Sequence, residues 1–488
     1  MHKKLLYKIL IVCMPLIAGC NSTGNNKKPN ILFILVDDLG WSDLGYTGST
    51  FYETPHVDEL ASQGMVFTDA YAACPVCSPS RAAIMSGKHP ARLNLTDWIP
   101  GNRHYGPHED QKLASKPFKL HLDLHETTLA ESFKAAGYST FFAGKWHLGE
   151  KNKYFPNRQG FDVNKGGNGT GHPAGGYFAP YQNPQLKDGP KGEYLTDRLA
   201  DETIKFIKQN NGKPFFAYLS FYTVHLPMQG KPDKVKKYRK KLSEMDYKGK
   251  EFVKRGDTYY KQWQNMPHYA AMVESMDENV GRVLKTLKNK GVDQNTIVVF
   301  TSDNGGMATS SQTGNIPTTN LQLKAGKGYL YEGGIRVPLI IRWPGEIEAG
   351  STSDFPVTGT DYYPTLLDLA GIAKKPGQHQ DGISLKPVLK GKDMDERPIY
   401  WHYPHYSGGL GGTPSAAIRL GNYKLIEFYE DDHLELYNLE NDIGENQDIS
   451  GKKPEITAKL KKMLKDWRTE VNAQMPYPNP AYDDDKTK

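Results

Sequence analysis

The sequence has few cysteines and few long apolar segments. Only four of its 488 residues are cysteine, and beyond the N-terminal segment no run approaches 18 apolar residues. A further membrane-spanning helix is therefore excluded. The 48 glycines and 32 prolines are spread along the chain, and no internal repeat or low-complexity segment is present. With 38% hydrophobic residues, this composition excludes disordered and fibrous proteins.

An excess of charge of one sign is also missing. The net charge of +6 falls to +3 once the three lysines of the N-terminal segment are set aside. Blocks of like charge are limited to residues 234–241 and 483–485. Nucleic-acid-binding proteins carry a basic patch or stripe, so the sequence gives no indication of a nucleic-acid partner.

The first twenty residues have the pattern of a targeting signal. Three lysines precede the apolar run 9–17, which is too short to span a bilayer. The run ends in Ile17-Ala18-Gly19-Cys20, which resembles the signal of a bacterial lipoprotein. An ordinary cleaved signal peptide is the alternative interpretation.

The lipoprotein interpretation sets the N-terminal boundaries. Residues 1–19 are then a signal peptide, Cys20 carries the lipid (palmitate), and residues 20–28 form a polar tether. The protein is expected to be exported and held to a membrane through this lipid alone. The absence of acidic residues just after Cys20 favours an anchor that faces the periplasm, with the cell surface as the alternative.

From residue 31 onward, short apolar strands alternate with amphipathic helices. This order predicts an α/β domain with a mostly parallel sheet covered on both faces. Four strands are expected at residues 31–36, 139–143, 215–220 and 296–301. Helices are expected at residues 128–136 and 196–208, and around an apolar face running from Met272 to Leu287.

The pattern changes after about residue 370. Residues 415–438 predict antiparallel strands, and a final amphipathic helix has Ile456, Leu460, Leu464 and Trp467 on one face. We therefore expect a large catalytic domain over residues 29–370 and a smaller α+β subdomain over residues 371–488.

Polar clusters follow each of the four expected strands. They begin at Asp37, Gly144, His225 and Ser302. In open α/β sheets, ligands bind at the carboxyl ends of the strands. Carboxylate and amide oxygens suit a hard divalent cation, and Asp37, Asp38, Asp303 and Asn304 supply them from two strand ends. Taken singly, each of these residues also fits a helix cap or a turn.

Cys74 and Cys77 are the two cysteines left in the mature chain. Their C-x-x-C spacing fits a redox disulfide in an exported protein. A zinc site needs two further ligands.

The residues after Cys77 favour a third interpretation. The string Cys77-Ser78-Pro79-Ser80-Arg81 resembles the signature of formylglycine-dependent sulfatases. The resemblance covers the chain from Pro29 onward. Further matches lie at residues 35–40, 144–149, 224–227, 302–306 and 326–334.

This resemblance implies an alkaline-phosphatase-like fold and a modified nucleophile. Cys77 is expected to be converted to formylglycine (3-oxoalanine) by a formylglycine-generating enzyme, and the hydrated aldehyde is the nucleophile. The metal is expected to be one calcium ion, held by the four oxygen donors above and by residue 77.

The resemblance also assigns roles to the cationic residues. Arg81 braces the diol, and Lys145 and Lys327 hold the sulfate oxygens. His225 is the general acid that protonates the leaving alcohol, and His147 is the base that releases sulfate. The chain departs from the family pattern at residues 322–327, where Gln-Leu-Lys-Ala-Gly-Lys replaces Pro-Leu-Arg-Gly-Gly-Lys, but the lysine is kept.

The expected activity is hydrolysis of a sulfate ester on a carbohydrate. The resemblance and the export signal point to oligosaccharides from a sulfated polysaccharide such as ulvan, carrageenan or a glycosaminoglycan. Substrate contacts are expected in polar and aromatic loops, although each of these residues also fits an ordinary surface loop. The candidates are Arg103, His104, His172, His402 and His405.

Two alternative functions remain open at this point. One is a phosphodiesterase or phosphonate monoester hydrolase of the same fold. The other is a catalytically inactive lipoprotein that binds sulfated glycans.

Overall fold

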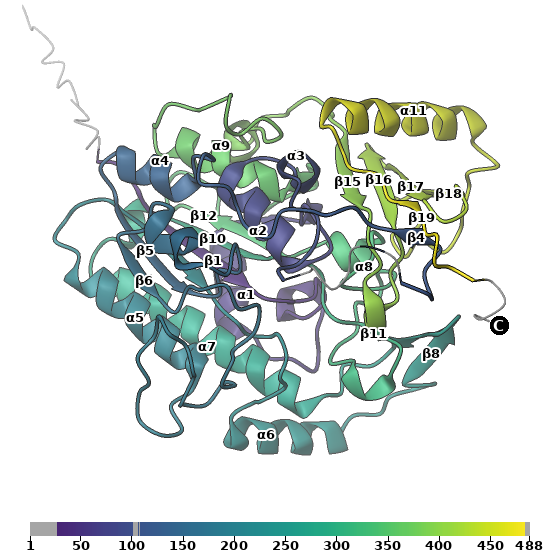
Figure 1. Cartoon of the computed structure of the whole chain (residues 1–488). Helices are drawn as coiled ribbons and strands as arrows, with labels where there is room; N and C mark the ends of the chain where they lie inside the picture. Colours follow the sequence, from purple (N-terminus) through teal and green to yellow (C-terminus); the bar gives the residue numbers. More distant parts are fainter. Residues whose placement is uncertain (1–26, 101–105, 107, 484–488) are drawn as a thin grey trace, which may run out of the picture.

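The computed structural model describes residues 27–100, 106 and 108–483 (Figure 1). The expected signal peptide, the lipid-bearing Cys20 and most of the tether lie outside the described residues, as do Arg103 and His104. Within the described part of the chain, no helix combines the length and the apolarity needed to cross a membrane.

An eight-stranded sheet forms the centre of the molecule (Figure 1). The strands, in spatial order, are β13 (Ser351–Ser353), β2 (Met65–Phe67), β12 (Leu339–Arg342), β10 (Thr296–Ser302), β1 (Asn30–Val36), β7 (Phe215–Ser220), β5 (Ser139–Gly144) and β6 (Val163–Lys165). All of them run in one direction except β12, which is antiparallel to both of its neighbours. The prediction of a mostly parallel sheet is confirmed.

Helices cover both faces of this sheet. Side chains of β1 alternate between two cores: Leu32 and Ile34 point to one, and Ile31 and Phe33 to the other. The first core is closed by α1 (Pro55–Gln63), α5 (Leu195–Gln209) and α7 (Pro267–Asn289), with α6 (Pro232–Ser243) packed alongside. The second is closed by α2 (Cys77–Ser86), α3 (Pro90–Leu93), α4 (Leu129–Ala135), α9 (Tyr362–Leu369) and α10 (Lys386–Leu389).

The helix predicted at residues 128–136 shows how the local sequence sets the start and the end of a helix. The hydroxyl of Thr128 accepts a hydrogen bond from the backbone N–H of Glu131, whose carboxylate accepts one from the N–H of Thr128. This capping box starts α4. Gly137, with φ of +88°, follows its end.

The C-terminal part has its own antiparallel sheet. Its strands are β15 (Ile399–Tyr403), β16 (Ser415–Leu420), β17 (Tyr423–Phe428) and β18 (Leu434–Asn438), in that spatial order. The helix α11 (Pro454–Glu470) lies against this sheet through Leu460, Leu464 and Trp467 (Figure 1). The predicted strands and final helix are present. Strand β15 is an addition, and α10 still packs in the core of the main sheet, so the second sheet begins well after residue 371.

Short elements complete the described part of the chain. Besides several 3-10 helices, they are β3 (Ala70–Tyr71) with β14 (Val357–Thr358), β4 (Leu113–Ala114) with β19 (Tyr477–Pro478), the three-stranded sheet of β8 (Phe252–Arg255), β9 (Thr258–Lys261) and β11 (Thr309–Ser310), and α8 (Glu332–Ile335).

Candidate active site

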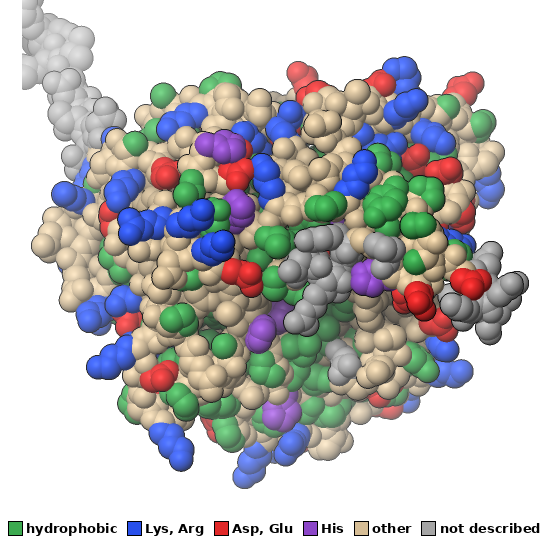
Figure 2. All heavy atoms as spheres, viewed as in Figure 1, with side chains coloured by type: hydrophobic (Ala, Val, Ile, Leu, Met, Phe, Trp, Pro, Cys, Tyr) green, Lys and Arg blue, Asp and Glu red, His purple; other side chains and the backbone are tan. Residues whose placement is uncertain are grey.

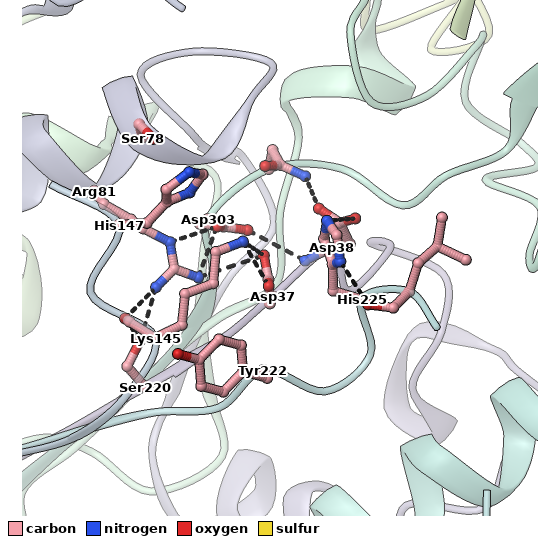
Figure 3. Close-up of polar contacts among 12 residues, drawn as sticks. Asp37, Asp38, Ser78, Arg81, Lys145, His147, Ser220, Tyr222, His225 and Asp303 are labelled. Carbon is pink, nitrogen blue, oxygen red and sulfur yellow. Dashed lines mark hydrogen bonds and ion pairs between the residues drawn. The ribbon is translucent and has the colours of Figure 1, made fainter. Parts of the chain in front are cut away.

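The ends of four parallel strands bring polar side chains to one edge of the central sheet (Figure 3). Asp37 and Asp38 follow β1, and Asp303 and Asn304 follow β10. Residues 145–147 follow β5, and His225 follows β7. The predicted gathering of these clusters is therefore what the structure shows, because parallel strands end on the same side.

Helix α2 begins at Cys77, beside this edge. Ligand atoms of Asp37, Cys77 and Asp303 lie within 4.8 Å of one another, and all three residues are buried. Cys74 and Cys77 are both free thiols, so the structure contains no disulfide between them. In the described residues this group, with its two carboxylates, is the only close set of three potential metal ligands. It does not resemble a four-ligand zinc site.

Arg81, one turn into α2, ties the helix to two strand ends. Its Nε donates a hydrogen bond to Oδ2 of Asp303 at 2.8 Å. Its Nη1 donates to the backbone carbonyl of Lys145 and to Oγ of Ser220, both at 2.8 Å. A buried guanidinium with this many partners is held in one position.

Two lysines pair with the two adjacent aspartates. Nζ of Lys145 donates to both carboxylate oxygens of Asp37, at 2.8 and 2.7 Å. Nζ of Lys327 lies 2.6 Å from Oδ1 and 2.8 Å from Oδ2 of Asp38. The site thus sets three carboxylates, including that of Asp303, against the cations of Arg81, Lys145 and Lys327.

The negative charge of one buried carboxylate, that of Asp37, is not fully compensated by the cations around it. Burial raises the pKa of Asp37 to about 8, although Lys145 acts in the opposite direction. Burial also acts to raise the pKa of Asp38, but the positive charge of Lys327 brings that pKa well below its usual value. A divalent cation beside Asp37 would restore its ionised form.

The fit to a metal is supported by an unpaired amide oxygen. Nδ2 of Asn304 donates to Oδ1 of Asp38 at 2.8 Å, but its own Oδ1 is buried and has no hydrogen-bond partner. Buried polar atoms are nearly always paired. A free amide oxygen on a residue that is bonded to Asp38 suits Ca²⁺, which takes carboxylate and amide oxygens.

Two site residues adopt the left-handed backbone conformation. Asp38 and His147 both have φ of +60°. The N–H of Asp38 donates to Oδ1 of Asp303 at 3.2 Å, and the N–H of His147 donates to the carbonyl of Asn168 at 3.1 Å. Such conformations are uncommon outside glycine and are typical of functional sites.

The two histidines are held by backbone carbonyls. Nε2 of His147 is hydrogen-bonded to the carbonyl of Ile99, and its buried Nδ1 has no partner. The N–H of Ile99 in turn donates to Oγ of Ser78 at 3.1 Å. Nδ1 of His225 lies 2.9 Å from the carbonyl of Leu226, and its Nε2 lies 3.8 Å from Asp38.

The environment keeps both imidazoles neutral. Burial lowers the pKa of His225 to about 3, against the opposing pull of Asp38. Burial and the charge of Lys145 bring the pKa of His147 well below its usual value. A neutral imidazole has one donor and one acceptor nitrogen, so the Ile99 carbonyl assigns the donor to Nε2 of His147.

The site opens into a cavity of about 770 Å³. Cys77, His147, His225 and Lys327 line it together. Its walls include Trp98, Phe155 and Tyr403, and Glu150 is an acidic lining residue. This size and mixed lining suit a small organic ligand. None of these four wall residues was singled out from the sequence, because they lie on separate segments that only the fold brings together.

The predicted substrate-binding histidines are placed differently from one another. His172 lines the cavity. His402 is buried in β15, with its ring nitrogens bonded to the Tyr429 hydroxyl at 2.8 Å and the Gln474 carbonyl at 3.0 Å. His405 is buried too, and its Nε2 lies 2.8 Å from Oγ1 of Thr96.

The positions of His402 and His405 correct the expectation that both contact substrate. Neither lines the cavity, because both side chains are buried and bonded to neighbouring residues. Tyr403, the last residue of β15, and residues 407–410 of the following loop line the cavity instead.

Comparison with known proteins agrees with this geometry. Residues 29–372 match the family model described as Sulfatase, and residues 325–470 match the model of the N-sulphoglucosamine sulphohydrolase C-terminal region. A sulfatase of Formosa agariphila is 33% identical, over 96% of this chain and 94% of its own length. Human N-acetylgalactosamine-6-sulfatase is 31% identical, over 89% of this chain and 78% of its own. The crystal structure of Ps i-CgsB in complex with k-i-k-neocarrahexaose has a TM-score of 0.72 and 30% identity, over 90% of this chain and 93% of that one.

Proposed function

Since this chain belongs to the sulfatase family and is a sulfuric ester hydrolase, we propose that it removes sulfate from oligosaccharides of a sulfated polysaccharide such as ulvan, carrageenan or a glycosaminoglycan. One observation carries the proposal: Cys77 lines the cavity together with Lys327, and its Sγ lies within 4.8 Å of the ligand oxygens of the buried Asp37 and Asp303. Relatives named for N-acetylgalactosamine 6-sulfate and a structural neighbour bound to a neocarrahexaose support a sugar substrate.

Residue 77 and the oxygen donors fit the groups that this chemistry needs. Formylglycine at residue 77, made by a formylglycine-generating enzyme, would supply a hydrated aldehyde as the nucleophile. Calcium would be held by Asp37, Asp38, Asp303 and Asn304, and would supply a positive charge for the sulfate oxygens. The unpaired Oδ1 of Asn304 and the raised pKa of Asp37 support this placement.

The cations of the chain itself bind and orient the sulfate group. Lys327 lines the cavity, and Lys145 lies buried beneath it against Asp37. Cys77 is the first residue of α2, so backbone N–H groups and the positive end of the helix dipole also face an anion there. Fixed positive groups of this kind stabilise the charge that develops on the transferring sulfate.

The two histidines handle the protons. His225 reaches the cavity with its ring, and an anionic sulfate ester bound beside it raises the pKa of the imidazole so that it can protonate the leaving sugar oxygen. His147 donates from Nε2 to the carbonyl of Ile99, which leaves Nδ1 as the acceptor. We therefore assign Nδ1 of His147 as the atom that accepts a proton when sulfate is released.

The proposed location is outside the cytoplasm. The lipoprotein-like signal before Cys20 supports an exported protein held by its N-terminal lipid and facing the periplasm. Sulfated polysaccharide fragments would reach such a site without crossing the inner membrane.

Sulfate release from defined sugars tests this function. The mature protein, produced together with a formylglycine-generating enzyme, is assayed on sulfated oligosaccharides of ulvan, carrageenan and chondroitin, with Cys77→Ala as control. We expect inorganic sulfate from at least one series, and none from the variant. Faster hydrolysis of a matched phosphate ester would indicate a phosphodiesterase or phosphonate hydrolase. Tight glycan binding that is unaffected by Cys77→Ala, with no sulfate release, would indicate an inactive binding protein.

A further inference from the structure

A second hollow opens off the catalytic cavity. Its volume is about 590 Å³, and it shares His172 and His225 with the cavity. Its other lining residues belong to segments 173–176 and 226–229. A ligand whose sulfate lies beside Cys77 can therefore extend past His225 into this hollow, which we call the side groove.

The walls of the side groove are small and largely uncharged. Apart from the two histidines, they consist of Pro173, Ala174, Gly175, Gly176, Leu226, Pro227 and Gln229. Oε1 of Gln229 accepts a hydrogen bond from the N–H of Tyr177 at 2.8 Å, and the Tyr194 hydroxyl donates to its backbone carbonyl at 2.8 Å. The groove is thus built from fixed segments. Its lining suits the face of a sugar ring better than a second charged group.

The basic helix α6 follows the side groove in the sequence: it begins three residues after the lining residue Gln229. Half of the cations on α6 are held by carboxylates within the fold. Nζ of Lys234 lies 2.9 Å from Glu274, Nζ of Lys237 lies 2.5 Å from Glu53, and Nζ of Lys241 lies 2.8 Å from Glu53.

The other three cations of α6 point outward. Lys236, Arg239 and Lys240 are exposed, and no carboxylate among the described residues forms an ion pair with them. Their spacing of three and four residues places them on one side of the helix. Lys and Arg side chains appear along the lower edge of the face in Figure 2, where Figure 1 places α6.

Chain geometry keeps these cations near the side groove. Gln229 and Lys236 are separated by three extended residues and one helical turn. At about 3.6 Å per extended residue and 1.5 Å per helical residue, the two backbones lie within roughly 17 Å. A glycan that fills the side groove would therefore need few additional sugars to reach the exposed charges.

We propose that the side groove, together with Lys236, Arg239 and Lys240, binds the sulfated glycan chain that continues from the sugar being hydrolysed. This inference rests on the proposed function and specifies its substrate as an oligosaccharide with several sulfate groups, rather than a single sulfated sugar. The unpaired cations complement the remaining sulfates, and salt weakens such exposed contacts.

Removal of the three charges tests the proposal. The variant K236Q/R239Q/K240Q is assayed on 4-nitrophenyl sulfate and on hexasaccharides of ι-carrageenan and chondroitin 6-sulfate. For the hexasaccharide that the wild type hydrolyses, we expect kcat/KM to fall about tenfold at low ionic strength, and the difference to disappear at high salt. Turnover of 4-nitrophenyl sulfate should not change.

A matched control removes the same charge elsewhere. Lys459, Lys461 and Lys465 are exposed on α11 of the C-terminal part, and K459Q/K461Q/K465Q should leave both activities unchanged. A second variant, Ala174→Trp, narrows the side groove at an exposed position. It should raise KM for the hexasaccharide without changing turnover of 4-nitrophenyl sulfate.

The outcomes separate this inference from the proposed function. Equal effects of the two triple variants, or no effect of either, would overturn the inference while sulfatase activity stands. If K236Q/R239Q/K240Q loses binding to phosphatidylglycerol vesicles but keeps its hexasaccharide turnover, α6 binds a lipid surface. That result would also overturn the inference. If the wild type releases sulfate neither from these three substrates nor from ulvan oligosaccharides, the proposed function fails and the inference falls with it.

Discussion

Arg81 and Asp303 are joined by a hydrogen bond of 2.8 Å from Nε to Oδ2, with a second contact of 2.8 Å from Nη2. Arg81 belongs to the signature string of α2, and Asp303 follows β10, more than two hundred residues later. This pair fixes the helix that carries Cys77 against the carboxylates of the candidate metal site. Both side chains are almost fully buried.

Loss of the Arg81 guanidinium should affect both stability and activity. Arg81→Gln leaves Asp303 buried without its partner, and breaking a buried pair in this way costs about 3–5 kcal/mol. We expect a lower free energy of unfolding in urea and a loss of at least about 100-fold in kcat/KM, because the donors around the reacting group move. Arg92→Gln is the control: Arg92 pairs with Asp381 at 2.7 Å in a more exposed place, so activity should remain. Full activity of Arg81→Gln would contradict this role.

The general-acid role of His225 predicts a dependence on the leaving group. A poor leaving group such as a sugar alcohol needs a proton, whereas a nitrophenolate does not. His225→Asn should therefore lower kcat by about 10²–10⁴-fold on a sugar sulfate, and far less on 4-nitrophenyl sulfate. Equal losses on the two substrates would show that His225 acts in some other way. His402→Gln, which alters a histidine away from the cavity, should show no such difference.

His402 should make the fold sensitive to acid. Burial lowers its pKa to about 3, against an ordinary value of 6.5, so the unfolded chain binds the proton more readily. The stability that this histidine contributes is complete above pH 6.5 and is lost as the pH falls from 6.5 toward 3. Between pH 7 and pH 5 we expect a loss of about 2 kcal/mol in unfolding free energy from this group. His402→Gln should lose less over the same range, and an identical pH dependence in the two proteins would refute the assignment.

Removal of calcium should lower activity and stability together. The candidate ligands are buried carboxylates and one amide, so the folded state alone offers the complete site. Calcium at about 100 times its dissociation constant stabilises a folded protein by about 2.7 kcal/mol. Treatment with EGTA should reduce sulfate release and the melting temperature, and added Ca²⁺ should restore both. Asn304→Ala should need more calcium for the same melting temperature. A protein whose activity and melting temperature ignore EGTA would exclude a calcium site.

The sequence predicted the strands and the meeting of polar clusters because both follow from local patterns, whereas the catalytic roles of the site residues rest on the resemblance to sulfatases. The buried run before Asp37 and the run before His225 each match a strand of the central sheet to within a residue. Since parallel strands end at one edge, their polar successors had to meet there. The pairing of Lys145 with Asp37 and of Lys327 with Asp38 needed the fold, because each pair joins segments that are far apart in the sequence.

The residues that face the substrate were harder to predict, because their positions also depend on how distant segments of the chain pack together. His402 is polar, but its strand is covered on both faces. Its ring nitrogens therefore form hydrogen bonds with Tyr429 and Gln474 inside the fold and do not contact a ligand. Trp98 lies on a segment without a strand or helix pattern, and only packing beside α2 brings it to the cavity. The Ser78 contact with Ile99 links the signature string to His147, and nothing in local periodicity signals it.

Peptide mass spectrometry across residue 77 tests the central claim most directly. The protein is isolated in active form from a host that makes a formylglycine-generating enzyme, and the peptide from α2 is compared with that of Cys77→Ala. Conversion of the thiol to an aldehyde predicts a mass about 18 Da below that of the unmodified peptide. An active protein in which residue 77 is unmodified cysteine, or is bonded to Cys74, would contradict the account.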